Sequence, residues 1–179
     1  MPKTKEDTTK IPEATLTPKE VAAAIFEAVA AKEMDRFPEF LHENATDDFV
    51  AIGQFVGRDA ITGFFQELYT AFPEFQIEVE RIVGDDQHAV VQWEASGIFS
   101  GGPFQGIEPT GKQVSIRGVD VMEFEDGKVR HNTIYYDGAA FARQIGMLPR
   151  EGSAADRGIL AAFNATTKLR SKLRERRGA

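Results

Sequence analysis

The chain has 179 residues and a formal net charge of −7 at pH 7, with 42% hydrophobic and 27% charged residues. These values indicate one ordinary globular domain and exclude a wholly disordered or collagen-like chain. It contains no cysteine, which excludes disulfides, thiolate metal sites and cysteine nucleophiles. No stretch approaches the roughly 18 apolar residues of a membrane span. The N-terminus lacks the apolar core of a signal peptide, so we expect a cytoplasmic protein.

The negative charge is unevenly distributed along the chain. Residues 150–179 carry eight Lys or Arg and three Asp or Glu, whereas residues 1–149 carry 13 basic and 25 acidic side chains. Because binding to phosphate needs a basic surface, the acidic body argues against nucleic acid as a partner.

The first half of the chain predicts helices and one short strand. Residues 1–16 are polar and show no apolar period, which indicates a disordered arm. Thr17-Pro18-Lys19-Glu20 forms a capping box with proline at the first helical position, and it predicts a helix that runs to about residue 32. The apolar spacing further predicts a shorter helix, a short strand and a longer helix, over residues 35–44, 49–55 and 57–71.

The second half predicts a sheet built from hairpins. Apolar and polar residues alternate from Phe75 to Glu80, and long strands are expected over residues 88–99, 112–125 and 129–136. Asp126-Gly127 is a strong hairpin signal between the last two strands. Asp137 is placed to cap a short helix that ends near Gly146. Helices followed by long hairpin strands indicate an α+β fold, with the helices on one face of an antiparallel sheet.

Several local motifs occur in an order and spacing that resemble a known family. They are Gly57-Arg58-Asp59-Ala60-Ile61, Ala71-Phe72-Pro73, Val91-Gln92-Trp93, Gly102-Pro103-Phe104-Gln105-Gly106-Ile107, Pro109-Thr110-Gly111-Lys112, Arg117-Gly118-Val119-Asp120-Val121, Asp126-Gly127-Lys128 and Tyr135-Tyr136-Asp137. Over residues 18–149 the chain resembles the nuclear transport factor 2-like superfamily and, within it, the SnoaL-like polyketide cyclase group, which includes ester cyclase-like proteins.

The resemblance implies a cone: a curved antiparallel sheet wrapped around the N-terminal helices, enclosing an apolar pocket. It also implies a homodimer through the outer face of the sheet. We therefore divide the chain into a disordered arm (1–16), a SnoaL-like domain (17–149) and a basic C-terminal helical extension (150–179).

Asp120 is the most informative single residue. It stands in a strand that is otherwise apolar on both sides, and it shares one face with Gly118, Met122 and Phe124. Burial in such surroundings would raise the pKa of the carboxyl and make it a general acid or base near neutral pH. The structural alternative is a carboxylate that pairs with an arginine or caps a loop at a dimer interface.

The family comparison supports the scaffold more than the chemistry. In the family's cyclases, a histidine on this strand and an aspartate on the last strand perform acid–base catalysis. Aligning the Asp-Gly-Lys hairpin places Asp120 at the histidine's position and Ile134 at the aspartate's position. Classical cyclase or epoxide hydrolase chemistry therefore does not carry over directly.

Further residues are expected to line the pocket beside Asp120. They are Met122, Asn132, Ile134 and Tyr136, together with either Trp93 or Glu94. Only one of Trp93 and Glu94 can face inward, and the tryptophan is favoured because large aromatic side chains are usually buried. Tyr136 could hydrogen-bond a substrate carbonyl, or its hydroxyl could bond the backbone as buried tyrosines commonly do.

The three histidines do not indicate a metal site. His42, His88 and His131 fall in different elements without metal-ligand spacing, so we expect no metal. His42-Glu43 and Asp47-Asp48 are interpreted as a solvated helix end and turn.

The tail over residues 154–177 has apolar residues partly at helical spacing and a crowd of Lys and Arg near its end. Such a basic amphipathic helix could lie on an anionic membrane or bind a partner. Because its apolar stripe is narrow, we favour a helix packed on the acidic body or across a dimer.

These observations leave three functions open for one fold. The first is cofactor-free cyclisation, isomerisation or hydration of an apolar polyketide-, steroid- or terpenoid-like substrate, with Asp120 transferring the proton. The second is non-catalytic binding of a small ligand in the same pocket. The third is a scaffold that acts only through its dimer surface, with a pocket filled by its own side chains.

Overall fold

The computed structural model describes residues 16–177, without the side chains of residues 172, 173 and 175–177. The predicted arm over residues 1–16 therefore lies outside the described residues, apart from its last position. The elements in order are α1 (Pro18–Ala31), a 3₁₀ turn η1 (Phe37–Phe40), β1 (Leu41–Phe49), β2 (Gly53–Val56), α2 (Arg58–Ala71), β3 (Gln76–Gly84), β4 (His88–Ile98), β5 (Gln113–Glu125), β6 (Lys128–Tyr136), α3 (Gly138–Ile145) and α4 (Ala154–Arg177).

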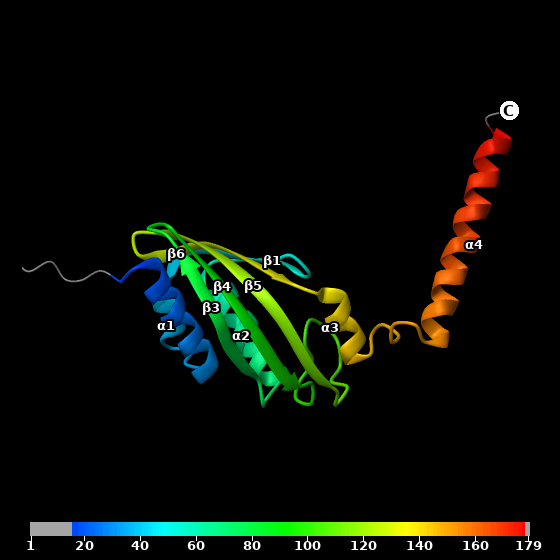
Figure 1. The fold of residues 1–179 in the computed structure, drawn as a ribbon. Helices are drawn as coiled ribbons and strands as arrows, with labels where there is room; N and C mark the ends of the chain where they lie inside the picture. The colour runs from blue at the N-terminus through cyan, green and yellow to red at the C-terminus, as the bar shows by residue number, and fades with distance from the viewer. Residues whose placement is uncertain (1–15, 178–179) are drawn as a thin grey trace, which may run out of the picture.

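The six strands form one curved sheet in the order β2-β1-β6-β5-β4-β3. Neighbouring strands are antiparallel except β1 and β6, which are parallel. Helix α1 packs against β3 and β4, and α2 packs against β1 and β2, so both helices contribute to one core on the inner face of the sheet (Figure 1). The predicted α+β class is confirmed; the parallel pair corrects the expectation of a purely antiparallel sheet.

The predicted helix caps and the hairpin are confirmed. The Thr17 hydroxyl accepts a hydrogen bond from the Glu20 backbone N–H, and the Glu20 carboxylate accepts one from the Thr17 N–H at 2.7 Å. Asp137 caps α3 in the same way, accepting from the Ala140 N–H at 2.8 Å. Asp126 and Gly127 both have positive φ, of 50° and 75°, which matches the twist of a tight hairpin.

The predicted helix over residues 35–44 is wrong beyond one 3₁₀ turn, and the predicted strand over residues 49–55 is right only for its second half, which forms β2. Helical structure is limited to η1, and the chain is already extended at Leu41. Residues 50–52 are a turn between β1 and β2. The polar run from His42 to Asp48 has weak intrinsic strand preference, so strand pairing with β6 and β2 determines its conformation.

Phenylalanines fill the core between α2, β1 and the loop after β4. Phe64 on α2 lies at the centre, with ring centroids 4.4 Å from Phe49, 4.8 Å from Phe55 and 5.8 Å from Phe104. Tilted pairs of this kind stabilise a core by about 0.5–1.5 kcal/mol each beyond the area they bury. This cluster forms one wall of the cavity described below.

Helix α4 stands clear of the sheet and of α1–α3 (Figure 1). Its apolar side chains Ile159, Leu160, Phe163 and Leu169 are 58%, 60%, 66% and 58% exposed. The predicted helix is therefore present, but it does not pack on the acidic body of its own chain. Within residues 16–177, no helix is long and apolar enough to span a membrane.

Candidate active site

The inner face of the sheet and the helices beneath it enclose a cavity with about 870 Å³ of space, part of it open to solvent. Its lining is almost wholly apolar and aromatic, as is usual for small-molecule sites. Three carboxyl or amide side chains enter it, from Asp47, Asp120 and Asn132, and all three are buried.

Asp120 on β5 is only 7% exposed and accepts two side-chain hydrogen bonds. The indole Nε1–H of Trp93 donates to one carboxylate oxygen at 2.7 Å, and the amide of Asn132 donates to the other at 2.8 Å. Trp93 lies on β4 and Asn132 on β6, so both neighbours of β5 hold this carboxylate. Two donors on one carboxylate stabilise its ionised form.

Gly118 makes room for the tryptophan. Trp93 lies directly opposite Gly118 in the β4–β5 pair. Gly118 precedes Asp120 by two residues on β5, so these two residues are on the same face of the sheet. A Cβ atom at Gly118 would lie 2.3 Å from the indole ring. The missing side chain therefore lets the indole lie across β5 and reach the carboxylate.

Asp47 is a second buried carboxyl, which the sequence interpretation placed wrongly in a solvated turn. It lies on β1, opposite Asn132 in the parallel β1–β6 pair, and is only 3% exposed. Its neighbours Ala45 and Phe49 are also buried on this face. That alternation of Ala45, Asp47 and Phe49 is the sequence signal that could have identified it.

The two carboxyls differ in their surroundings. Burial and, to a smaller extent, the charge of Asp120 together raise the pKa of Asp47 to about 8, against a hydrogen bond with Asn132 that lowers it. Burial also raises the pKa of Asp120, to about 6, against the hydrogen bonds from Asn132 and Trp93. Two such groups titrate as a coupled pair, and between the two values the pair holds one proton.

The amide oxygen of Asn132 lacks a hydrogen-bond donor among the cavity residues that the structure describes. Its Oδ1 atom is buried and has no hydrogen-bond partner among the described residues, a costly arrangement unless a donor is supplied. Asp47 lies opposite Asn132 and can supply one only when its carboxyl is protonated. Burial raises the pKa of Asp47 further above its ordinary value than that of Asp120, so Asp47 is the better placed of the two to keep a proton at neutral pH.

The other predicted pocket residues divide into two groups. Trp93, Met122, Asn132, Ile134 and Tyr136 line the cavity, and Ile134 lies directly opposite Asp120. Burial raises the pKa of the Tyr136 hydroxyl, which is half-buried at the cavity. Glu94 does not line it. Because Trp93 faces inward, Glu94 faces outward, where it is exposed and accepts a hydrogen bond from Ser115 at 3.1 Å.

The histidines lie in separate places: His42 on β1, His88 at the start of β4, and His131 on β6. Across residues 16–177, no three His, Asp or Glu side chains gather as metal ligands would.

Comparisons with known proteins agree with this fold. The family model for SnoaL-like polyketide cyclase matches residues 19–145. The chain therefore belongs to the SnoaL-like polyketide cyclase family. A search of the curated proteins found no match.

Solved structures with the same fold are distant in sequence. A candidate SnoaL-like polyketide cyclase from Jannaschia sp. CCS1 is 22% identical, covers 78% of this chain and 99% of its own, and has a TM-score of 0.67. AclR, a candidate hydroxylase from Streptomyces galilaeus, is 19% identical over 90% of this chain and 97% of its own, with a TM-score of 0.65. A protein from Catenulispora acidiphila with a ketosteroid isomerase-like fold is 16% identical over 77% and 99%, with a TM-score of 0.61.

Proposed function

We propose that this protein binds a neutral, largely apolar carbonyl compound and catalyses its cyclisation or isomerisation without a cofactor. The observation that carries the proposal is the pair of buried carboxyls, Asp47 and Asp120, with unequal proton affinities in an apolar cavity. Carboxyls whose surroundings separate their pKa values are suited to act as acid and base.

Asp120 serves as the base in this reaction and Asp47 as the acid. Asp120 removes a proton from a carbon next to the substrate carbonyl and becomes a carboxylic acid. The electron pair moves onto the carbonyl oxygen, to which Asp47 donates its proton. In cyclisation, the enol carbon attacks a second carbonyl, whose oxygen takes the proton from Asp120, while the enol O–H returns its proton to Asp47 and the first carbonyl re-forms. In isomerisation, Asp120 returns its proton to a different carbon of the conjugated enol, and the O–H proton goes back to Asp47. General acid–base catalysis of this kind contributes about 10²–10⁴-fold in rate.

The lining of the cavity favours an uncharged substrate. Among the described residues that line it there is no Lys, Arg or His, so no cation would offset the cost of burying an anionic ligand. Aromatic side chains from α1, α2, β1, β6 and α3 surround the cavity, which suits flat, fused rings such as those of polyketides, steroids or terpenoids.

Non-catalytic binding of the same ligand is the alternative. One observation favours it: both oxygens of Asp120 already accept hydrogen bonds from the protein, as in a structural carboxylate. The two functions share the pocket and differ in whether Asp120 exchanges a proton with the ligand.

Exchange of carbon-bound hydrogen in heavy water, followed by proton NMR, distinguishes the two. The probe is β-tetralone, a neutral bicyclic ketone, and quenching of Trp93 fluorescence reports its binding. We expect the protein to accelerate exchange, and Asp120→Asn to lower the rate by about 10²–10⁴-fold while the ketone still binds. Asp47→Asn keeps an N–H donor and should lower the rate less.

Asp48→Asn is the matched control, because Asp48 is the next residue on β1 and bonds Gln54 outside the cavity. It should leave the exchange rate unchanged. A protein that binds the ketone and exchanges it no faster than buffer contradicts catalysis and supports simple binding. Unchanged exchange in Asp120→Asn, with a lowered melting temperature, makes Asp120 structural.

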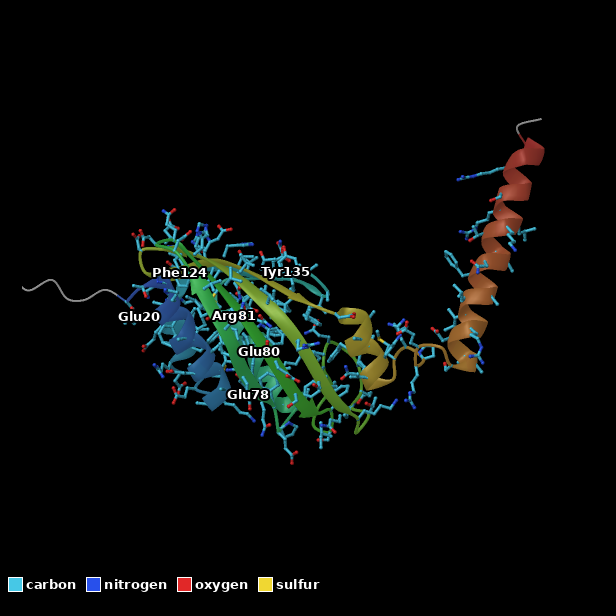
Figure 2. The ribbon with its side chains drawn as sticks, in the orientation of Figure 1. Glu20, Glu78, Glu80, Arg81, Phe124 and Tyr135 are labelled. Carbon is cyan, nitrogen blue, oxygen red and sulfur yellow. The ribbon has the colours of Figure 1, made fainter. Side chains whose placement is uncertain are left out.

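The proposal includes a homodimer through the outer face of the sheet, the face opposite the cavity. A row of valines crosses that face, with Val83 paired to Val90 and Val90 to Val121. Tyr135 on β6 is 51% exposed beside them. Figure 2 shows Tyr135 together with the charged side chains Glu78, Glu80 and Arg81 along β3, so the apolar row has a polar rim, as interfaces commonly do.

A further inference from the structure

Helix α4 carries an apolar stripe that its own chain does not cover. Residues at alternating spacings of four and three form the centre of the stripe: Ala155, Ile159, Ala162, Thr166 and Leu169. This is the spacing of a helix that packs along a second helix. Thr166 fits such a seam, because its hydroxyl donates to the carbonyl of Ala162 within the helix. The exposed Phe163 and Ile159 add the largest apolar surface.

One edge of the stripe carries a negative, an aromatic and a positive side chain at equal intervals. Asp156, Phe163 and Arg170 are seven residues apart, which places them along one side of the helix, two turns from one another. If a second copy of α4 runs antiparallel with Phe163 against Phe163, each Asp156 lies opposite the other copy's Arg170. In a parallel pair the two copies of this edge would lie on opposite sides of the seam, so Asp156 and Arg170 of the two helices would not meet.

We propose that α4 is a self-recognition helix, which pairs antiparallel with α4 of a second copy of this chain. A two-fold axis through Phe163 places the negative Asp156 of each helix beside the positive Arg170 of the other. Antiparallel pairing also separates the two basic C-terminal ends, each of which carries Lys168, Arg170 and Arg174. Asp156 remains available, since only one of its oxygens is committed within the chain, accepting from the Gly152 N–H at 2.9 Å.

The distribution of charge favours a second copy over a membrane surface. Helices that lie on anionic membranes carry cations along the polar face beside their apolar surface. In α4 the exposed Ile159, Leu160 and Phe163 lie in the N-terminal half, where Arg157 is balanced by Asp156. The unbalanced cations begin only at Lys168, beyond most of the apolar stripe.

Distances between nitroxide labels test the pairing in the full chain. The chain has no cysteine, so Asn164→Cys or Ser171→Cys gives one label for each protomer, at exposed positions outside the stripe. Asn164 is next to the proposed two-fold axis. The two copies of Ser171 would be displaced along the helices by 16 residues, roughly 24 Å at about 1.5 Å per residue. We expect a defined distance at both positions, shorter at Asn164.

Charge reversal tests the contacts themselves. Arg170→Glu should abolish the defined distance, because the introduced carboxylate would face Asp156 of the other copy, and Asp156→Arg combined with Arg170→Glu should restore it. Lys168→Glu makes the same charge change on the far side of the helix and should leave the distance intact. Circular dichroism checks that each variant keeps its helix.

Three results would overturn the proposal. Equal distances at both labels indicate a parallel pair, and a distance insensitive to Arg170→Glu shows that other contacts bring the helices together. The third result is no defined distance at all. If the full chain then sediments with vesicles of phosphatidylserine and phosphatidylcholine, α4 is a membrane-binding helix; if it does not, α4 has no partner of either kind.

Discussion

At the scale of single residues, the difference between Asp47 and Asp120 comes from their neighbours. Asp120 receives N–H donors from Trp93 and Asn132 on both carboxylate oxygens. Asp47 is equally buried but bonds only to Asn132 and also lies near the charge of Asp120. Burial raises both pKa values, and the uneven supply of donors separates them.

The stability of the protein should depend on pH through Asp47. Burial holds the pKa of Asp47 at about 8 in the folded chain, above its ordinary value of 3.8. Between these values the folded chain keeps a proton that the unfolded chain has lost, so stability falls as the pH rises through this range. Asp47→Asn removes this loss of stability with rising pH, because an amide does not titrate. Because one pKa unit corresponds to about 1.4 kcal/mol, we expect a gain of a few kcal/mol above the upper value.

Thermal unfolding of Asp47→Asn and the parent chain at matched pH measures this. Below the ordinary value both chains should have similar melting temperatures, since Asp47 is then protonated in the folded and unfolded states. A gain in stability that does not grow with pH would contradict a proton held by Asp47.

The rate of carbon-acid exchange should show a bell-shaped pH dependence. Asp120 acts as a base only when ionised, so the rate rises as the pH passes its pKa of about 6. Asp47 acts as an acid only when protonated, so the rate falls as the pH passes its pKa of about 8. Asp47→Asn should retain the rise and lose the fall. A profile without the alkaline limb in the parent chain would remove Asp47 from the reaction.

Sequence alone identified one member of the pair and missed the other. Asp120 stands out because Val119, Val121 and Met122 around it are apolar. Asp47 is flanked by Thr46 and Asp48, and the run is so polar that it resembles a solvated turn. Its burial results from pairing with β6, more than 80 positions later in the chain, and local sequence does not encode such a contact.

At the scale of elements, the pairing of β4 with β5 creates the environment of Asp120. The indole of Trp93 occupies the space over Gly118 and bonds the carboxylate two residues further along β5. A side chain at Gly118 would displace the ring and remove one of the two donors. Gly118 is therefore a positioning residue that acts through Trp93.

Gly118→Ala should lower stability by about 1–3 kcal/mol through overpacking against the indole. Trp93 is the only tryptophan of the chain, so its emission spectrum reports the displacement directly. Gly63→Ala is the matched control, because nothing lies within 4 Å of a Cβ atom at that position in α2. It should leave the spectrum unchanged and stabilise the helix by up to about 1 kcal/mol. Equal effects of the two changes would contradict the role assigned to Gly118.

The elements themselves were predictable where the pattern is local. The capping box at Thr17 and the turn at Asp126-Gly127 set their own geometry, and both are confirmed. The sequence does not determine which of Trp93 and Glu94 faces inward, because the two are adjacent on β4 and a β-bulge would exchange the faces on which they lie. In the structure Trp93 faces inward and its ring lies over Gly118, in space that a Cβ atom would fill.

At the scale of the whole molecule, the proposed sheet dimer can be tested at its exposed aromatic residue. In a chain that also carries Arg170→Glu, so that α4 does not pair, Tyr135→Lys places a charge in the centre of the outer face without touching the cavity, and it should halve the mass measured by light scattering. Val56→Lys is the matched control, since Val56 is also exposed, at 62%, but lies on β2 at the edge of the sheet. An unchanged mass in Tyr135→Lys would contradict an interface on this face.

The central claim is that one of two carboxyls in the cavity keeps its proton at neutral pH. Carbon-13 NMR of the aspartate side-chain carboxyls over a pH titration tests it most directly, with Asp47→Asn and Asp120→Asn to assign the signals. We predict two carboxyls that titrate well above the others, with the higher step absent in Asp47→Asn. Burial accounts for both shifts, since it raises the pKa of Asp47 to about 8 and that of Asp120 to about 6. A titration in which every aspartate ionises near the ordinary pKa of 3.8 would contradict the account.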